Sequence, residues 1–176
     1  DGLHRLFLKD KKSIAVINSH NGSSDVQLAS LLQSLVPYYR LASFDLKAFP
    51  AQPSKTLENL NRFDLLFVAN PTNEFTSEEK FMLDQFTQNG GNSLFMIDPV
   101  KIAQDSLFSI KGNAIAIPTD IGLDELFFKY GARLNKDIVT DLFSAPIVLA
   151  QGENASSEYR PYPWIYHPLV EPNAEH

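Results

Sequence analysis

The clearest hydrophobic pattern in the chain predicts a strand, a helix and a second strand in direct succession. Residues 64–69 form a nearly continuous apolar run, as is typical of a parallel strand that is buried on both faces. The helix is expected to begin with a capping box, because the hydroxyl of Thr76 is followed three residues later by Glu79. The glycine pair 90–91 is a natural helix end, and residues 94–97 form the next apolar strand.

Apolar positions on either side of this unit repeat the alternation of strands and helices. Residues 13–18 and 40–49 are predicted strands, while residues 28–36 and 123–130 carry leucines and aromatics at helical spacing. A weaker helical turn is expected at 57–60. The pattern predicts an α/β fold with a doubly wound, mostly parallel sheet and helices on both faces, as in the three-layer domains of amidotransferases and flavodoxins.

The C-terminal part of the chain has a different pattern. Strand-like runs occur at 137–142 and 146–150, and prolines recur from there into an aromatic-rich tail. Proline cannot donate a ladder hydrogen bond, so these segments are expected to be antiparallel or edge strands. We therefore divide the chain into an α/β core domain, residues 1–133, and a C-terminal extension with edge strands, residues 134–176.

Charge and cysteine content exclude several classes of function. The formal net charge is −6, and there is no extended cluster of lysine and arginine, so no nucleic-acid partner is expected. The chain has no cysteine, which removes thiol catalysis, thiolate metal sites and disulfides together. No stretch approaches the length of an apolar membrane span, so any membrane attachment would use segments absent from this chain.

The loop after the first strand is the best candidate for binding a small ligand. It contains Ser19, His20, Asn21, Gly22 and Ser23, and it lies where doubly wound sheets bind ligands, beyond the carboxyl end of a strand. Its hydroxyls before a helix loosely resemble the phosphate loop of flavodoxins, so a flavin or another phosphate-containing ligand is one interpretation. The other, which the sequence favours, is that the hydroxyls cap the following helix.

Catalytic and metal-binding patterns are missing from the sequence. A class I amidotransferase needs a nucleophilic cysteine, and a serine counterpart needs G-x-S-x-G; neither is present. Sequence spacing alone brings no serine, histidine and carboxylate together. The histidines show no metal-ligand spacing and are expected to be surface or tail residues. We expect no catalytic residue, no metal and no cofactor.

Two groups of aromatic residues are candidates for protein contacts instead. Phe81 projects from a different side of its helix than the apolar stripe, so either its own domain or a partner covers it. Tyr162, Trp164 and Tyr166 lie in the proline-rich tail, where aromatic residues typical of binding hot spots are concentrated. The alternative for the tail is an extended strand packed on its own domain.

Several segments together resemble the GldG family, the extracytoplasmic auxiliary components of gliding-motility ABC transporters in Bacteroidetes. The resemblance extends over nearly the whole chain from Ile14 onward, and its most specific parts are the LDELFFKYG and SAPI segments. The matching segments are residues 64–99, 105–107, 123–131, 133–135, 144–147 and 163–169.

The resemblance implies a non-enzymatic domain on the periplasmic, extracytoplasmic side of the inner membrane. Transmembrane helices outside this chain would anchor it, and a permease and an ATPase would be separate subunits. We therefore expect a transport-associated interaction domain whose partners are these subunits or other envelope proteins.

Overall fold

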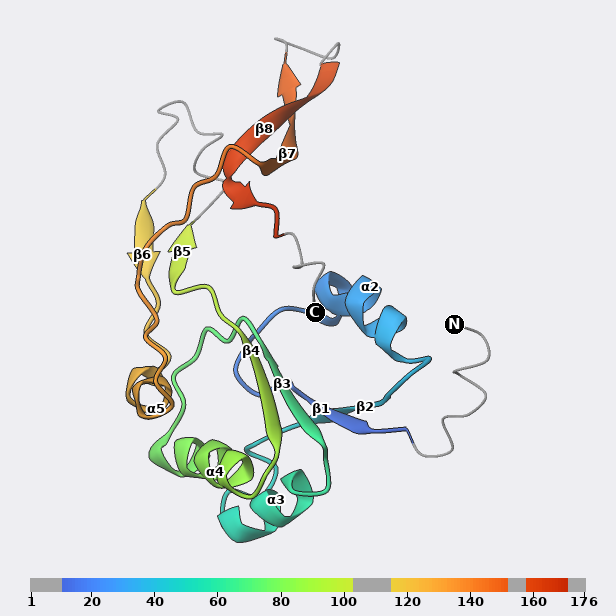
Figure 1. Cartoon of the computed structure of the whole chain (residues 1–176), viewed down its shortest axis with the longest axis vertical. Helices are drawn as coiled ribbons and strands as arrows, with labels where there is room; N and C mark the ends of the chain where they lie inside the picture. Colours follow the sequence, from blue (N-terminus) through green and yellow to red (C-terminus); the bar gives the residue numbers. More distant parts are fainter. Residues whose placement is uncertain (1–10, 103–114, 152–157, 171–176) are drawn as a thin grey trace. The chain divides into compact units, whose positions relative to one another are not determined.

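The computed structural model describes residues 11–102, 115–151 and 158–170 (Figure 1). Residues 105–107, which carry part of the resemblance, lie outside these ranges. The chain separates into two compact units, residues 1–135 and 136–176. Each unit is described by itself.

The first unit is built on a four-stranded sheet with the order β2-β1-β3-β4, in which every pair of neighbours is parallel. This confirms the predicted α/β fold with a doubly wound parallel sheet. Its strands are β1 (Ser13–Ile17), β2 (Arg40–Phe44), β3 (Leu65–Ala69) and β4 (Asn92–Met96). Its helices are α2 (Asp25–Leu35), α3 (Pro53–Leu60), α4 (Ser77–Gln88) and α5 (Asp124–Lys129). A short antiparallel pair, β5 (Val100–Ile102) and β6 (Ala116–Pro118), completes the unit.

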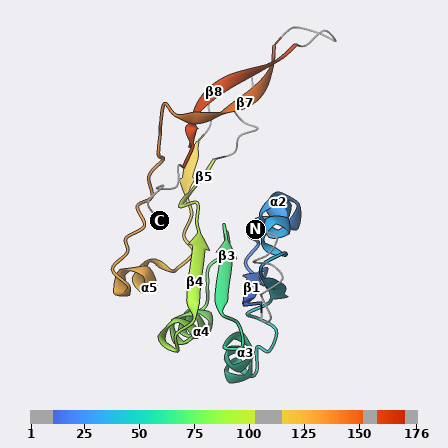
Figure 2. The same cartoon turned by 45° about the vertical axis from the view of Figure 1, so that its right-hand side comes forward.

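The helices cover both faces of the sheet (Figures 1 and 2). Side chains alternate between the faces along each strand, so neighbouring residues of β1 and β3 enter different cores. The core on the α2 face contains Ile14, Leu28, Phe67 and Ala69. The larger core on the opposite face is formed with α3, α4 and α5 and includes Ala15, Leu60, Leu66, Val68, Leu83, Phe86 and Leu126.

The central strand and helix agree with the sequence pattern in detail. Four of the five residues of β3 are buried, as expected for a strand covered on both faces. Thr76 caps α4 and accepts a hydrogen bond from the Glu79 amide, while the Glu79 side chain accepts one from the Thr76 amide, which confirms the predicted capping box. Gly90 has a φ of +93°, as a helix-ending glycine often does.

Two predicted strands differ from the structure. The strand predicted at 40–49 ends at Phe44, because the Asp45 carboxylate accepts a hydrogen bond from the Lys47 amide and turns the chain there. Residues 137–142 form no strand. At their end, the Asp141 carboxylate accepts a hydrogen bond from the Phe143 amide, a side-chain turn that competes with strand pairing.

The second unit contains an antiparallel hairpin of β7 (Ser144–Gln151) and β8 (Glu158–Pro168). This confirms that the C-terminal strands are antiparallel; they pair with each other in a two-stranded sheet of their own. Pro146 lies opposite Pro163, and Val148 lies opposite Pro161. Each strand has an unpaired outer edge, which is where proline is tolerated because its missing amide hydrogen costs no ladder bond.

Candidate functional site

The loops after β1 and β3 meet where the strand order of the sheet reverses. The chain leaves β1 toward β2 on one side, while β3 and β4 lie on the other side. In doubly wound sheets this switch point is the usual position for a ligand site, because the two connections diverge and leave a crevice between them. The candidate loop from Ser19 to Ser23 therefore lies at the position that the fold favours.

Backbone hydrogen bonds hold the loop after β1 against the end of β3. The Ser23 amide donates to the Ala69 carbonyl over 2.9 Å, and the Thr72 and Asn73 amides donate to the His20 carbonyl over 3.0 and 3.3 Å. Gly22 permits this approach, since a Cβ there would collide with the Ala69 carbonyl oxygen. The loop is thus held at the carboxyl end of β3 by main-chain bonds.

Side chains of asparagine and threonine add to this connection. Asn21 adopts a φ of +46°, a left-handed conformation that asparagine tolerates, and its amide group donates to the Thr72 hydroxyl. The Thr72 hydroxyl in turn donates to the Asn21 carbonyl over 2.9 Å. The polar groups of Asn21 and Thr72 are therefore engaged with each other.

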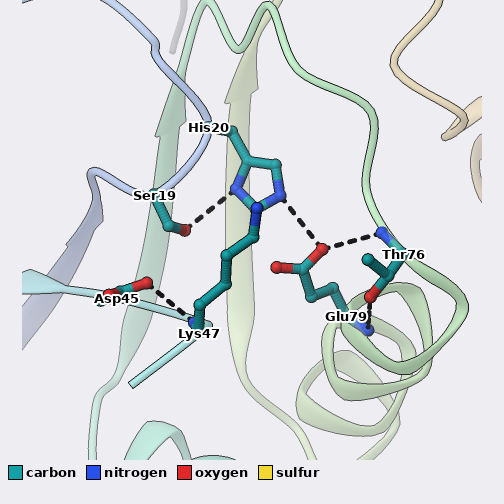
Figure 3. Close-up of polar contacts among 6 residues, drawn as sticks. All are labelled: Ser19, His20, Asp45, Lys47, Thr76 and Glu79. Carbon is teal, nitrogen blue, oxygen red and sulfur yellow. Dashed lines mark hydrogen bonds and ion pairs between the residues drawn. The ribbon is translucent and has the colours of Figure 1, made fainter. Parts of the chain in front are cut away.

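His20 is buried, with 2% of its surface exposed, so the expectation that it lies on the surface is wrong. Its ring stacks on Phe75, with ring centroids 3.7 Å apart and planes inclined by 10°. Its two nitrogens contact Ser19 Oγ at 3.0 Å and Glu79 Oε2 at 3.2 Å (Figure 3). The structure thus brings a serine, a histidine and a carboxylate together, which sequence spacing could not do.

Glu79 has two roles at this junction, of which the sequence revealed one. Its Oε2 accepts from the Thr76 amide, as the capping box requires, and also contacts the buried imidazole of His20. The residue is only 3% exposed, and its other oxygen, Oε1, has no hydrogen-bond partner among the described residues. A capping glutamate is thereby converted into a buried carboxylate that connects α4 to the loop after β1.

Hydrogen bonding fixes the tautomer of the imidazole. A carboxylate only accepts hydrogen bonds, so Nε2 of His20 carries the proton and donates it to Glu79. Nδ1 then accepts from the Ser19 hydroxyl. Both ring nitrogens are occupied by protein partners, and the arrangement serves to hold the loop in place.

Burial lowers the pKa of His20 below its usual value of 6.5, because the charged form loses hydration. The contact with Glu79 acts in the opposite direction and is the weaker influence. Lys47 lowers the pKa further, and Asp45 raises it; both lie in the turn after β2 (Figure 3). The neutral imidazole is therefore the favoured form at pH 7.

Comparison with known protein families identifies the chain. The model of the family described as an ABC-type uncharacterized transport system matches residues 11–176. The chain belongs to this family. No curated protein matches the chain. Membership in the ABC-type transport family indicates an auxiliary role in transport and association with the components of an ABC transporter.

Over residues 11–102, 115–151 and 158–170, no group of three or more histidine, aspartate or glutamate side chains is arranged to hold a metal ion. In the same part of the chain, no helix is both long and apolar enough to cross a membrane.

The aromatic contact candidates are found in both units. Phe81 on α4 is 58% exposed, so the first unit does not bury it. Tyr162 lies in the regular ladder of β8 with β7, whereas Trp164 and Tyr166 lie where the register of the two strands shifts, between Pro163 and Pro168. The rings of Trp164 and Tyr166 pack edge to face, with centroids 5.3 Å apart. Whether these residues contact a partner stays a prediction.

Proposed function

We propose that this chain is a non-enzymatic, extracytoplasmic domain of a membrane-anchored ABC-transporter auxiliary protein that takes part in gliding motility through protein contacts. The observation that carries this proposal is the match of residues 11–176 to the ABC-type transport family. The resemblance of segments such as LDELFFKYG to the GldG family supplies the link to gliding. The partners would be the permease, the ATPase or other envelope proteins.

The burial of the histidine and the carboxylate at the candidate loop supports binding through a surface rather than catalysis. His20 is 2% exposed and its partner Glu79 is 3% exposed, so neither side chain is open to a substrate. The β7–β8 hairpin, in contrast, exposes large aromatic side chains, among them Tyr166 at 43%, whose ring packs against Trp164. Exposed aromatic side chains supply rigid contact area, so the segment of β8 that carries Trp164 and Tyr166 is our first choice for a contact surface.

Binding measurements on surface variants test the contact assignment. Trp164→Ala should weaken binding of the chain to its transporter subunits by at least about tenfold, as expected when a hot-spot aromatic is truncated. Tyr159→Ala is the matched control, because Tyr159 is an exposed aromatic of the same strand that lies in the regular ladder with β7, away from the segment of Trp164. Equal affinities for Trp164→Ala and the parent chain would refute the assignment to β8, and Phe81→Ala tests α4 in the same way.

The absence of cysteine makes the proposed location easy to test. Ser54→Cys places a single thiol at an exposed position in the first turn of α3. In intact cells that produce the full-length protein, with any cysteine outside this chain replaced by serine, a maleimide that cannot cross the inner membrane should label this thiol. Labelling only after the inner membrane is permeabilised would contradict the extracytoplasmic location.

The switch-point position of residues 19–23 favours a second candidate function, the binding of a flavin or another phosphate-containing ligand. A visible absorption spectrum of the purified chain, together with melting curves in the presence of flavins and nucleotides, decides this alternative. Bound chromophore or a raised melting temperature would support it, because a ligand that binds only the folded state stabilises that state.

A further inference from the structure

We propose that His20 and Glu79 form a pH-sensitive latch, closed at neutral pH and opened by acid, which holds the loop after β1 against the first turn of α4. This inference goes beyond the proposed function and does not depend on it. It rests on a buried contact between two segments that are 59 residues apart in the sequence.

The latch joins the loop and the helix through one pair of side chains. His20 is 2% exposed and Glu79 is 3% exposed, so solvent does not screen the contact between Nε2 and Oε2. The His20 carbonyl accepts from two amides of the loop after β3, those of Thr72 and Asn73. Withdrawal of His20 from its site would therefore also release these backbone bonds.

Protonation strengthens the contact of the imidazole with Glu79 but disturbs its other contacts. A proton on Nδ1 turns this atom from an acceptor into a donor, so the Ser19 hydroxyl must rotate from donating to accepting. The new positive charge lies against the Phe75 ring, away from water. The charged side chains that act on His20 are Glu79 from α4, and Lys47 and Asp45 from the turn after β2.

The direction of the pH effect follows from these groups. Desolvation, supported by Lys47, outweighs Glu79 and Asp45, so the pKa of His20 in the closed state lies below 6.5. In the open state the imidazole is hydrated and binds its proton more readily. The stabilisation of the closed state relative to the open state is therefore complete above pH 6.5, and it is lost as the pH falls through the lower pKa. Between these two pH values, the ratio of open to closed molecules rises about tenfold for each unit of pH.

Amide hydrogen exchange of the whole chain tests the latch. The Thr72 and Asn73 amides donate to the His20 carbonyl and report the closed state. After correction for the intrinsic effect of pH on exchange, their protection should fall as the pH falls from 6.5 to the pKa of His20 in the closed state, by up to about tenfold per pH unit, and then level off. Amides within β3, Leu65–Ala69, should keep their protection. Unchanged protection at the loop amides, or an equal loss throughout β3, would overturn the proposal.

Two variants distinguish an effect of His20 protonation from a purely structural role of the contact with Glu79. Glu79→Gln keeps a residue able to complete the capping box but removes the charge that favours imidazolium in the closed state. The pKa of His20 in that state should fall further, so the loss of protection should become larger and its midpoint should move to lower pH. His20→Gln should make the protection of the Thr72 and Asn73 amides independent of pH. Glu78→Gln is the matched control, since Glu78 is an exposed glutamate in the same helical turn. A control that shifts the midpoint as much as Glu79→Gln would refute the assignment to Glu79.

Nuclear magnetic resonance of the parent chain provides a test that requires no variant to fold. The His20 ring signals should titrate with a midpoint below 6.5, and the chemical shifts of the Thr72 and Asn73 amides should change with the same midpoint. A ring that titrates at or above 6.5 would refute acid opening, as would amide shifts that do not follow the ring.

Discussion

The parallel sheet of the first unit and the hairpin of the second use strands in opposite ways. In β3, four of five residues are buried between helices on both faces. In β8, none of the 11 residues is buried, and three of them are prolines. A strand such as β3 is stabilised by the apolar area that it removes from water, whereas β8 depends mainly on its ladder with β7.

Because of this difference, substitutions in the two units should affect different properties. A two-stranded sheet is marginally stable alone in water, and no side chain described between residues 136 and 170 belongs to a buried core. Substitutions in the first unit should therefore change mainly the free energy of unfolding. Substitutions on the exposed faces of the hairpin should change mainly its contacts with other molecules.

The largest expected effect comes from the core of the first unit. Phe86 on α4 is 1% exposed, so Phe86→Ala should lower the free energy of unfolding by about 3–5 kcal/mol. Tyr159→Ala on the hairpin, where the ring is 74% exposed, should change stability by less than about 0.5 kcal/mol. Phe81→Ala, on the same helix as Phe86 but 58% exposed, is expected to behave like Tyr159→Ala.

Urea unfolding can follow the two units separately. The described helices, α2 to α5, all belong to the first unit, so far-ultraviolet circular dichroism reports mainly on it. Trp164 is the chain's single tryptophan and lies in the second unit, so its fluorescence reports on the hairpin. If Phe86→Ala and Tyr159→Ala lowered the free energy of unfolding equally, the two units would not differ as described.

A smaller effect is expected where the loop after β1 approaches β3. Gly22→Ala places a methyl group against the Ala69 carbonyl oxygen, and backbone atoms cannot rotate away as a flexible side chain could. The loss should be about 1–3 kcal/mol in urea unfolding, as for other over-packed sites. Ser23→Ala is the control, because the bond from its amide to Ala69 belongs to the main chain and remains. A neutral Gly22→Ala would mean that the loop can move away from β3 at little cost.

Local patterns were sufficient to predict much of the first unit. The apolar run of β3, the capping pair of Thr76 and Glu79 and the glycine after α4 all indicate the same element boundaries. Such agreement between independent local patterns is typical of segments whose structure depends little on distant residues. The predicted strand at 137–142 lacked this agreement, and the Asp141 turn ends that segment instead.

The contact between His20 and Glu79 could not be predicted in this way. The capping box alone accounts for a glutamate at position 79. Nothing in the neighbouring sequence distinguishes a capping glutamate that is buried, as this one is, from an exposed one. The pair forms because β1 and β3 are neighbours, which brings the loop after one strand next to the helix that follows the other. A histidine after one strand and a capping glutamate after its neighbour would have been the pattern to look for.

Thr76→Ala is expected to cost less than Gly22→Ala and separates the two roles of Glu79. The substitution removes the hydroxyl that accepts from the Glu79 amide and should cost about 1 kcal/mol in urea unfolding. The bond in which the Thr76 main-chain amide donates to Glu79 Oε2 survives, so the carboxylate stays in place and His20 keeps its partner. Ser77→Ala is the control for an exposed hydroxyl in the same turn. If Thr76→Ala also moved the pH at which the loop amides lose protection, capping and latch would be one coupled structure; an unchanged midpoint would show that α4 is capped and latched by separable interactions.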